Sequence, residues 1–325
     1  MTGRVPTTGL PDLQALTDGL AAAVRSSAMG GPLAIVRREP AACPGTFPIE
    51  VLTCRFADGS QRQIVCKYGR GRNGAMHGHR GGVALEARVY RHFLASLHLS
   101  SPAFYGAFDV AATGDTWLFI EYLDGSRRLD DTPGPAALVR AAEWIGRFHA
   151  LARAQLMAAR TTAVHAYDAR YYRGWVERTS ALAGHLRRPP PWLAALTRHF
   201  EAFVTPLLAA ESTVVHGEYY PKNILVRDGI IHPIDWESVA VAAGEIDLAS
   251  LTERWPTEKV RQCEIDYQRA RWPEGAPAAF ERTLAAARLY LHFRWLGERI
   301  EWTTREKNHW RFDAMHELAE RLGLL

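Results

Sequence analysis

The sequence has no long apolar runs, no short cysteine spacings and no blocks of like charge. No uninterrupted apolar stretch reaches the length of a membrane span, and the first residues, MTGRVP, contain no apolar signal region. Arginines are scattered among acids, without a sustained basic run or a nucleic-acid-binding motif. We therefore expect a cytoplasmic protein that binds neither membranes nor nucleic acid.

Cysteine and histidine are placed too sparsely for a disulfide framework or a zinc site. The 13 histidines form no clear metal constellation, because the closest pair, His77 and His79, is flanked by glycines. The cysteines likewise have no paired short spacing: Cys43, Cys54, Cys66 and Cys263. We expect reduced thiols, which are the default in this compartment.

The composition is that of a globular protein with a sizeable core. The chain has 325 residues, 47% of them hydrophobic and 23% charged, with a net charge of +4. This length allows one large domain or two lobes. The pattern changes near residue 125: an amphipathic helix at 10–28, strands and one further helix precede it, and mainly helical segments such as 136–150 follow it.

Lysine is scarce, and one lysine stands in an apolar strand. Only four of the 39 basic residues are lysines: Lys67, Lys222, Lys259 and Lys307. Lys67 ends the apolar run 63–67, which follows a turn at 58–60 and a strand predicted at 49–56. Against the arginine bias, it suggests a point charge chosen for phosphate. Residues 84–94 have the spacing of an amphipathic helix and carry Glu86, a candidate partner for Lys67.

Three short apolar runs frame a polar loop later in the chain. They lie at 213–215, 224–226 and 230–234, with the turn pair Asp228-Gly229 between the last two. As strands, they would place three oxygen-bearing side chains at one end of a small sheet: Glu218, Asn223 and Asp235. Two of these groups could hold Mg²⁺, which prefers hard oxygen ligands, while an acid positions a nucleophile. The alternative is a hairpin rich in Asp and Asn with solvated acids.

This region resembles the aminoglycoside phosphotransferase and choline kinase-like family. The loop His216 to Asn223 is similar to the family's His-Gly-Asp-x-x-x-x-Asn, and residues 234–237 are similar to its Ile-Asp-Trp/Phe-Glu. Glu218 stands where the family usually has the catalytic Asp. Residues 244–249 resemble a shortened form of its Gly-Asp-Pro-x-x-Asp-Leu-Ala, which makes Asp247 the buried anchor of the loop. Residues 145–150 resemble its Leu-Gly-Arg-Leu-His-Ala helix.

The resemblance implies an α+β fold of the protein-kinase type with two lobes. A small N-terminal lobe with an antiparallel sheet would span residues 1–124, and a larger, mainly helical lobe would span residues 125–325. The strand 117–123 would lead into a linker at about 120–126, whose backbone would bind the adenine edge. The implied nucleotide-binding residues are Lys67, Glu86, Glu121, Tyr122 and Leu123.

The resemblance also implies the residues of the catalytic centre and of the acceptor pocket. The catalytic set is His216, Glu218, Asn223 and Asp235, of which Asn223 and Asp235 would bind the metal ion. The C-terminal helices of the family wall the acceptor pocket, where acids and aromatic faces could contact the substrate. The candidates for that contact are Glu237, Trp295, Glu298 and Trp302. Core packing is the alternative for most aromatic residues of this segment.

The sequence thus predicts an enzyme, a kinase that uses ATP, with GTP as the alternative, and Mg²⁺ to phosphorylate a hydroxyl group of a small molecule. The acceptor could be an antibiotic, a sugar, an amino alcohol or a biosynthetic intermediate. A catalytically silent binding protein and a kinase for Ser or Thr in a peptide are alternatives. The Gly-, Arg- and His-rich segment 69–82 either folds over phosphates or an anionic substrate, or forms a surface loop. The oligomeric state stays open.

Overall fold

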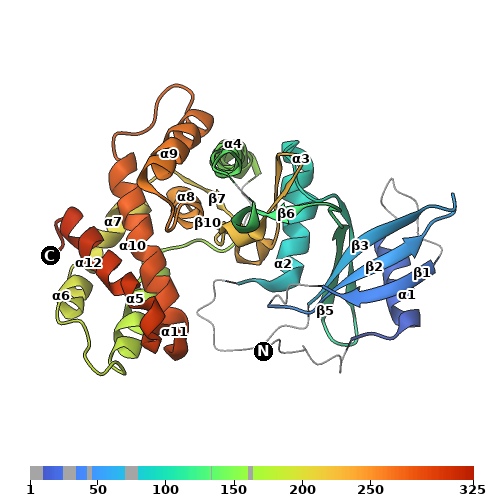
Figure 1. Ribbon diagram of the computed structural model, residues 1–325, viewed down its shortest axis with the longest axis horizontal. Coiled ribbons are helices and arrows are strands. Elements are labelled where there is room, and N and C mark those ends of the chain that lie inside the picture. Colours follow the sequence, from blue (N-terminus) through green and yellow to red (C-terminus); the bar gives the residue numbers. More distant parts are fainter. Residues whose placement is uncertain (1–9, 25–33, 42–45, 70–79, 133, 160–163) are drawn as a thin grey trace. The chain divides into compact units, whose positions relative to one another are not determined.

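The chain forms two compact units. The computed structural model describes residues 10–24, 34–41, 46–69, 80–132, 134–159 and 164–325. The first unit contains the described part of Met1–Gly74, together with Arg80–Arg127 and Leu225–Ser238. The second contains Arg128–Ile224 and Val239–Leu325. The chain therefore leaves the first unit after Arg127 and returns to it for one short segment (Figure 1).

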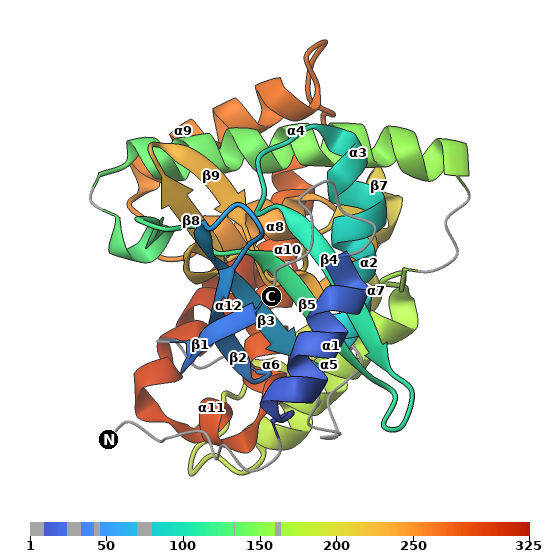
Figure 2. The same cartoon turned by 90° about the vertical axis from the view of Figure 1, so that its right-hand side faces the viewer.

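An antiparallel sheet of five strands is the centre of the first unit (Figure 2). The strands pair in the order β1-β2-β3-β5-β4. Their bounds are Ala34–Pro40 for β1, Ile49–Arg55 for β2, Gln61–Tyr68 for β3, Phe104–Val110 for β4 and Asp115–Glu121 for β5. The predicted strands at 49–56 and 63–67 correspond to β2 and β3, and Lys67 lies on β3 opposite Ile49 and Leu118.

Helix α1, Leu13–Val24, covers one face of this sheet. Leu16 and Leu20 of α1 pack against alternate residues of β2 and β3, among them Leu52 and Ile64. This contact follows from the period of two in strands, which sends every second side chain to the same face. Gly106 lets α1 lie close to β4, because a Cβ there would stand 2.3 Å from the carbonyl oxygen of Ala23.

The helix predicted at 84–94 is present, but its second half is a π-helical turn. α2 spans Gly82–Val89, the π-helical turn spans Tyr90–Leu94, and the short α3 spans Ala95–Leu97. A three-stranded sheet has the order β6-β8-β9, with bounds Arg127–Arg128, Ile224–Arg227 and Ile230–Pro233. α2 packs against β5 and against the 3-10 turn Trp236–Ser238, which brings Glu86 beside the segment that follows β9.

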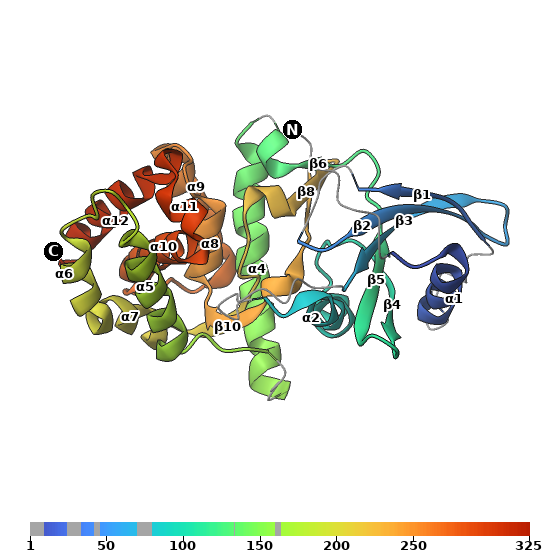
Figure 3. The same ribbon diagram turned by 90° about the horizontal axis from the view of Figure 1, so that it is seen from below.

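The second unit is mainly helical (Figure 3). Its helices are α4 Ala136–Ala159, α5 Ala169–Ala183, α6 Leu193–Arg198, α7 Phe200–Ala209, α8 Glu245–Leu251, α9 Thr257–Arg271, α10 Phe280–Glu298, α11 Ile300–Thr304 and α12 Trp310–Arg321. A two-stranded antiparallel sheet joins β7, Ser212–Val215, and β10, Ala240–Ala243. α10 packs against α5, α7, α8 and α12, and 14 of its 19 residues are buried.

Some predictions fall outside the described residues. These are the end of the helix predicted at 10–28, the pair His77 and His79, Cys43, and residues 70–79 of the segment 69–82. In the part of the chain that the structure describes, no helix has both the length and the apolar character of a membrane span.

Candidate functional site

In the first unit, Lys67 is surrounded by three carboxylates. Its Nζ donates a hydrogen bond to Glu86 Oε2 at 2.6 Å and another to Asp235 Oδ1, and Glu237 Oε2 lies 3.5 Å away. Glu86 also accepts a hydrogen bond from the backbone N–H of Trp236 at 3.2 Å. The predicted pairing of Lys67 with Glu86 is therefore formed, and it fixes the lysine against the segment that follows β9.

Charge and burial oppose each other in this cluster. Burial alone would lower the pKa of Lys67, but Glu86, Asp235 and Glu237 raise it well above its ordinary value. Burial raises the pKa of Glu86, and the Lys67 charge counteracts this shift. Glu237 also binds Arg80, whose Nε lies 3.0 Å from Oε1. Lys67 therefore keeps its positive charge at neutral pH.

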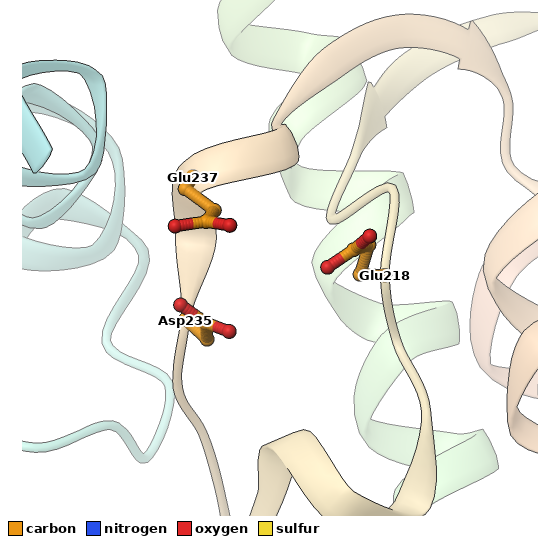
Figure 4. A group of neighbouring side chains, drawn as sticks. All are labelled: Glu218, Asp235 and Glu237. Carbon is orange, nitrogen blue, oxygen red and sulfur yellow. The ribbon is translucent and has the colours of Figure 1, made fainter. Parts of the chain in front are cut away.

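Asp235 is the carboxylate of this cluster that solvent can reach. Its side chain is 29% exposed, whereas the side chains of Glu86 and Glu237 are 2% and 0% exposed. The backbone of Asp235 has a φ of 68°, a left-handed conformation that few residues other than glycine adopt. Such backbone strain is concentrated at functional sites. Figure 4 shows Asp235 and Glu237 two residues apart on one segment, and Glu218 on a separate loop.

The predicted linker residues follow β5. The carboxylate of Glu121 accepts hydrogen bonds from the backbone N–H of Ala103 at 3.1 Å and from Arg227 Nη1 at 3.0 Å. Leu123 is buried, and Tyr122 is half-buried. The side chain of Glu121 is thus bound within the first unit, and a contact with adenine would use the backbone of this segment.

In the second unit, Asp247 holds the loop that follows β7. Its Oδ2 accepts a hydrogen bond from the backbone N–H of His216 at 2.6 Å, and its Oδ1 accepts one from the N–H of Gly217 at 2.9 Å. Further along, Asn223 Nδ2 donates to the carbonyl of Glu218 at 3.0 Å. The predicted role of Asp247 as a buried anchor is confirmed. His216, Glu218 and Asn223 are all buried, which contradicts the alternative of solvated side chains on a hairpin.

A second layer of polar groups supports Asp247. His149 Nε2 lies 3.1 Å from Asp247 Oδ2, and His149 Nδ1 lies 2.9 Å from the Tyr267 hydroxyl. That hydroxyl accepts a hydrogen bond from Arg271 Nη1 at 2.6 Å. Burial lowers the pKa of His149 to about 4, although Asp247 opposes the shift. His149 is therefore neutral near pH 7 and can donate one ring N–H to Asp247.

We expect the folded state to lose stability as the pH falls from 6.5 towards 4. In this window an unfolded chain protonates His149 while the folded chain does not, so acid favours unfolding. The complete shift corresponds to about 3 kcal/mol. Urea denaturation at pH 7 and pH 5 measures it, and His149→Gln should reduce the difference between the two values. The matched change His199→Gln, at an exposed residue, should leave the difference between the two pH values as it is in wild type. An equal pH dependence in wild type and His149→Gln would show that His149 does not cause the loss of stability.

The sequence did not reveal the partner of Glu218. Arg294, in the middle of α10, donates from Nη2 to Glu218 Oε1 and from Nη1 to the carbonyl of Gly217 at 2.5 Å. The side chains of Arg294 and Glu218 are 3% and 6% exposed. In the sequence Arg294 stands between Phe293 and Trp295, and these apolar neighbours indicate burial but do not identify its partner.

Aromatic residues lie next to the loop. Trp295 Nε1 donates to the Tyr220 hydroxyl at 2.8 Å, and the rings of Trp295 and Trp302 are 4.7 Å apart. Both tryptophans are half-buried, as is Glu298 at the end of α10. The structure thus brings two of the predicted acceptor contacts together beside the loop. Glu237 does not join them within the second unit, because it is buried near Lys67 in the first.

The second unit also contains an open pocket of about 690 Å³ between α9, α10 and α12. His292 and Trp310 form part of its wall, and burial lowers the pKa of His292 to about 3. The predicted acceptor contacts Trp295, Glu298 and Trp302 do not line it.

Comparison with known proteins identifies the fold. Macrolide 2′-phosphotransferase MphH from Brachybacterium faecium is 21% identical, with 94% of this chain and 98% of that chain covered and a TM-score of 0.56. Choline kinase from Cryptosporidium parvum is 12% identical, with 97% and 98% covered and a TM-score of 0.64. Choline kinase LicA from Streptococcus pneumoniae is 13% identical, with 90% and 95% covered and a TM-score of 0.58. These likenesses confirm the predicted kinase-like fold class.

The model of the phosphotransferase enzyme family (APH) matches residues 55–281, more than two thirds of the chain. The chain therefore belongs to this family, and the predictions of the family and of a phosphotransferase are confirmed. A comparison with curated proteins finds no match.

Proposed function

We propose that the protein transfers the γ-phosphoryl group of ATP, with Mg²⁺, to a hydroxyl group of a small molecule. The observation that carries the proposal is the cluster of Lys67 with Glu86 and Asp235. A buried lysine fixed by a helix glutamate, beside a partly exposed aspartate, is the arrangement needed to bind phosphates next to a metal ion. In this proposal Lys67 binds the α- and β-phosphates, and Glu86 orients it.

We propose Asp235 and Asn223 as the Mg²⁺ ligands. Asp235 offers a carboxylate that is 29% exposed, and Asn223 uses Nδ2 to bind the carbonyl of Glu218, which leaves Oδ1 as its ligand atom. Both are hard oxygen donors of the kind that Mg²⁺ prefers. A bound metal ion would neutralise part of the triphosphate charge. The backbone of Glu121, Tyr122 and Leu123 would bind the nucleobase.

Glu218 is proposed to orient and deprotonate the acceptor hydroxyl. Its backbone is held by Asn223 and, through Gly217, by Asp247. His216 supports the turn, since its Nδ1 accepts the N–H of Glu218 at 3.3 Å. In phosphoryl transfer the transition state is loose, so the acid contributes mainly by positioning the attacking oxygen.

Nucleotide and acceptor identity belong to the same proposal. One structural neighbour is a GDP complex of an aminoglycoside 2′-phosphotransferase, and another is LicA with AMP, so either purine is compatible with this fold. A further neighbour is a complex with GDP and kanamycin. We propose that Trp295, Trp302 and Glu298 contact the acceptor. The second candidate function is a protein that binds nucleotide without catalysing phosphoryl transfer.

We expect Mg²⁺-ATP to raise the melting temperature of the protein. Ligand at 100 times its Kd stabilises the folded state by about 2.7 kcal/mol. Thermal denaturation with ATP, GTP, ATP plus EDTA, and Mg²⁺ alone separates the contribution of the nucleotide from that of the metal ion. Asp235→Asn keeps the size of the side chain but removes a metal ligand, and it should lose most of the Mg²⁺-dependent increase. A folded wild-type sample that shows no shift at millimolar Mg²⁺-ATP would refute nucleotide binding.

A further inference from the structure

Arg294 binds both the acid of the loop and the peptide group before it. The two residues Arg294 and Glu218 are 76 positions apart in the sequence, yet their side chains are buried together. Nη1 binds the carbonyl oxygen of Gly217, and Nη2 binds Oε1 of Glu218. Because the guanidinium is planar and rigid, these two bonds fix the carboxylate relative to its own backbone.

Stability alone does not explain this pair. Burial by itself would lower the pKa of Arg294, but Tyr220 and Glu218 outweigh this effect and raise the pKa well above its ordinary value. The arginine is therefore a permanent cation inside a helix that is buried on nearly all sides. Replacing a buried ion pair by apolar residues of similar volume is often neutral or stabilising. A function of Arg294 in holding the loop that carries Glu218 explains this buried charge better than packing does.

The backbone around Glu218 is fixed separately from its side chain. Its carbonyl is bound by Asn223, and the preceding N–H groups are bound by Asp247. Glutamate has one more methylene than aspartate and therefore one more rotatable bond, which would spread the carboxylate over several positions. Arg294 removes that freedom by binding one carboxylate oxygen.

We propose that Arg294 is a positioning residue that holds the Glu218 carboxylate for phosphoryl transfer. The inference rests on the proposed function and adds a residue to it. Arg294 binds Oε1, and the carboxylate held in this way accepts the hydrogen bond of the acceptor hydroxyl. The geometry is specific for the length of glutamate, because an aspartate carboxylate would be withdrawn by roughly 1.5 Å, one carbon–carbon bond.

Two substitutions test the positioning role. Arg294→Lys keeps the charge but offers a single nitrogen, which cannot bind both oxygens in the same geometry. Glu218→Asp keeps the carboxylate and Arg294 but separates them. Each should lower kcat by about 10- to 100-fold, the effect of a misplacement of about 1 Å. The KM for ATP should change by less than about two-fold, because neither change removes a nucleotide contact.

The assay measures phosphate release from Mg²⁺-ATP with water as acceptor, and phosphoryl transfer to kanamycin, a macrolide and choline as probe acceptors. Arg288→Lys is the matched control, since Arg288 also lies on α10 and binds the carboxylate of Glu264 at 2.7 Å. It should leave kcat unchanged. Circular dichroism and thermal denaturation establish that each variant is folded.

The outcomes separate the two proposals. If wild type turns over and Arg294→Lys behaves like Arg288→Lys, Arg294 is structural and the inference is wrong. If Glu218→Asp equals or exceeds wild type, Arg294 is not matched to glutamate, and the inference is again wrong, even where Arg294→Lys fails to fold. If wild type transfers phosphate to no acceptor, water included, the proposed function itself fails, and the inference fails with it.

Discussion

Glu218→Gln should lower turnover by about 100- to 10,000-fold and leave nucleotide affinity nearly unchanged, as expected when a positioned general base is lost. Glutamine has the shape of glutamate, and its amide oxygen can still accept the hydrogen bond from Arg294 Nη2. It cannot take up a proton from an attacking hydroxyl. The measurement is kcat with the best acceptor, together with the Kd for Mg²⁺-ATP.

The stability of this variant has to be measured with its activity. Removing one charge of a buried pair leaves the other uncompensated, which costs about 3–5 kcal/mol in typical cases. Glu264→Gln is the matched control, because it removes the carboxylate that binds Arg288 on the same helix. Glu264→Gln should have a lower melting temperature than wild type but retain its turnover. Full activity in Glu218→Gln would exclude a catalytic role, whereas a wild type that binds Mg²⁺-ATP and phosphorylates nothing would favour the silent binding protein.

Local pattern was sufficient to predict the strands that frame the loop. The turn pair Asp228-Gly229 predicted a hairpin, and both residues have positive φ, 52° and 78°, between β8 and β9. Such a turn matches the twist of two antiparallel strands. The contact of Lys67 with Glu86 was also predictable, because the strand and the helix were separately recognisable and the resemblance supplied their relation.

The long-range contacts were not predictable from spacing. Arg294 is one of many arginines in the chain, and no periodicity distinguishes an arginine that binds the loop from one that is solvated. Glu237 shows the same difficulty, because its contacts with Lys67 and Arg80 join residues that are far apart in the sequence. The grouping of Leu225–Ser238 with the first unit likewise depends on tertiary contacts and leaves no local signal.

The π-helical turn Tyr90–Leu94 was also invisible to the sequence pattern. The apolar spacing of residues 84–94 matches a regular α-helix. A single widened turn changes the positions of the apolar residues too little for the pattern to reveal it. The turn begins four residues after Glu86, so the same helix that carries the partner of Lys67 contains an irregularity of a type often found at functional sites.

Lys67→Met should reduce turnover by about 100- to 1,000-fold, the cost of removing one preorganised cationic donor from a developing charge. It should also destabilise the protein by about 3–5 kcal/mol at pH 8, because buried carboxylates lose their cation. The side chain of Glu86 is 2% exposed, so water cannot solvate the charge that has lost its partner. Activity assays and urea denaturation measure the two effects separately.

The destabilisation in Lys67→Met should depend on pH, with a sign fixed by Glu86. Burial already raises the pKa of Glu86, and Lys67 is the main group that lowers it, so the pKa rises further in the variant. A folded state with a raised carboxyl pKa binds more protons than the unfolded chain, and its stability decreases as the pH rises through that pKa. The deficit relative to wild type should therefore be smaller at pH 5 than at pH 8. Lys67→Met/Glu86→Gln should recover much of the loss at pH 8 without recovering turnover; an equal deficit at both pH values, with no recovery in the double variant, would show that Glu86 does not depend on Lys67 for its charge.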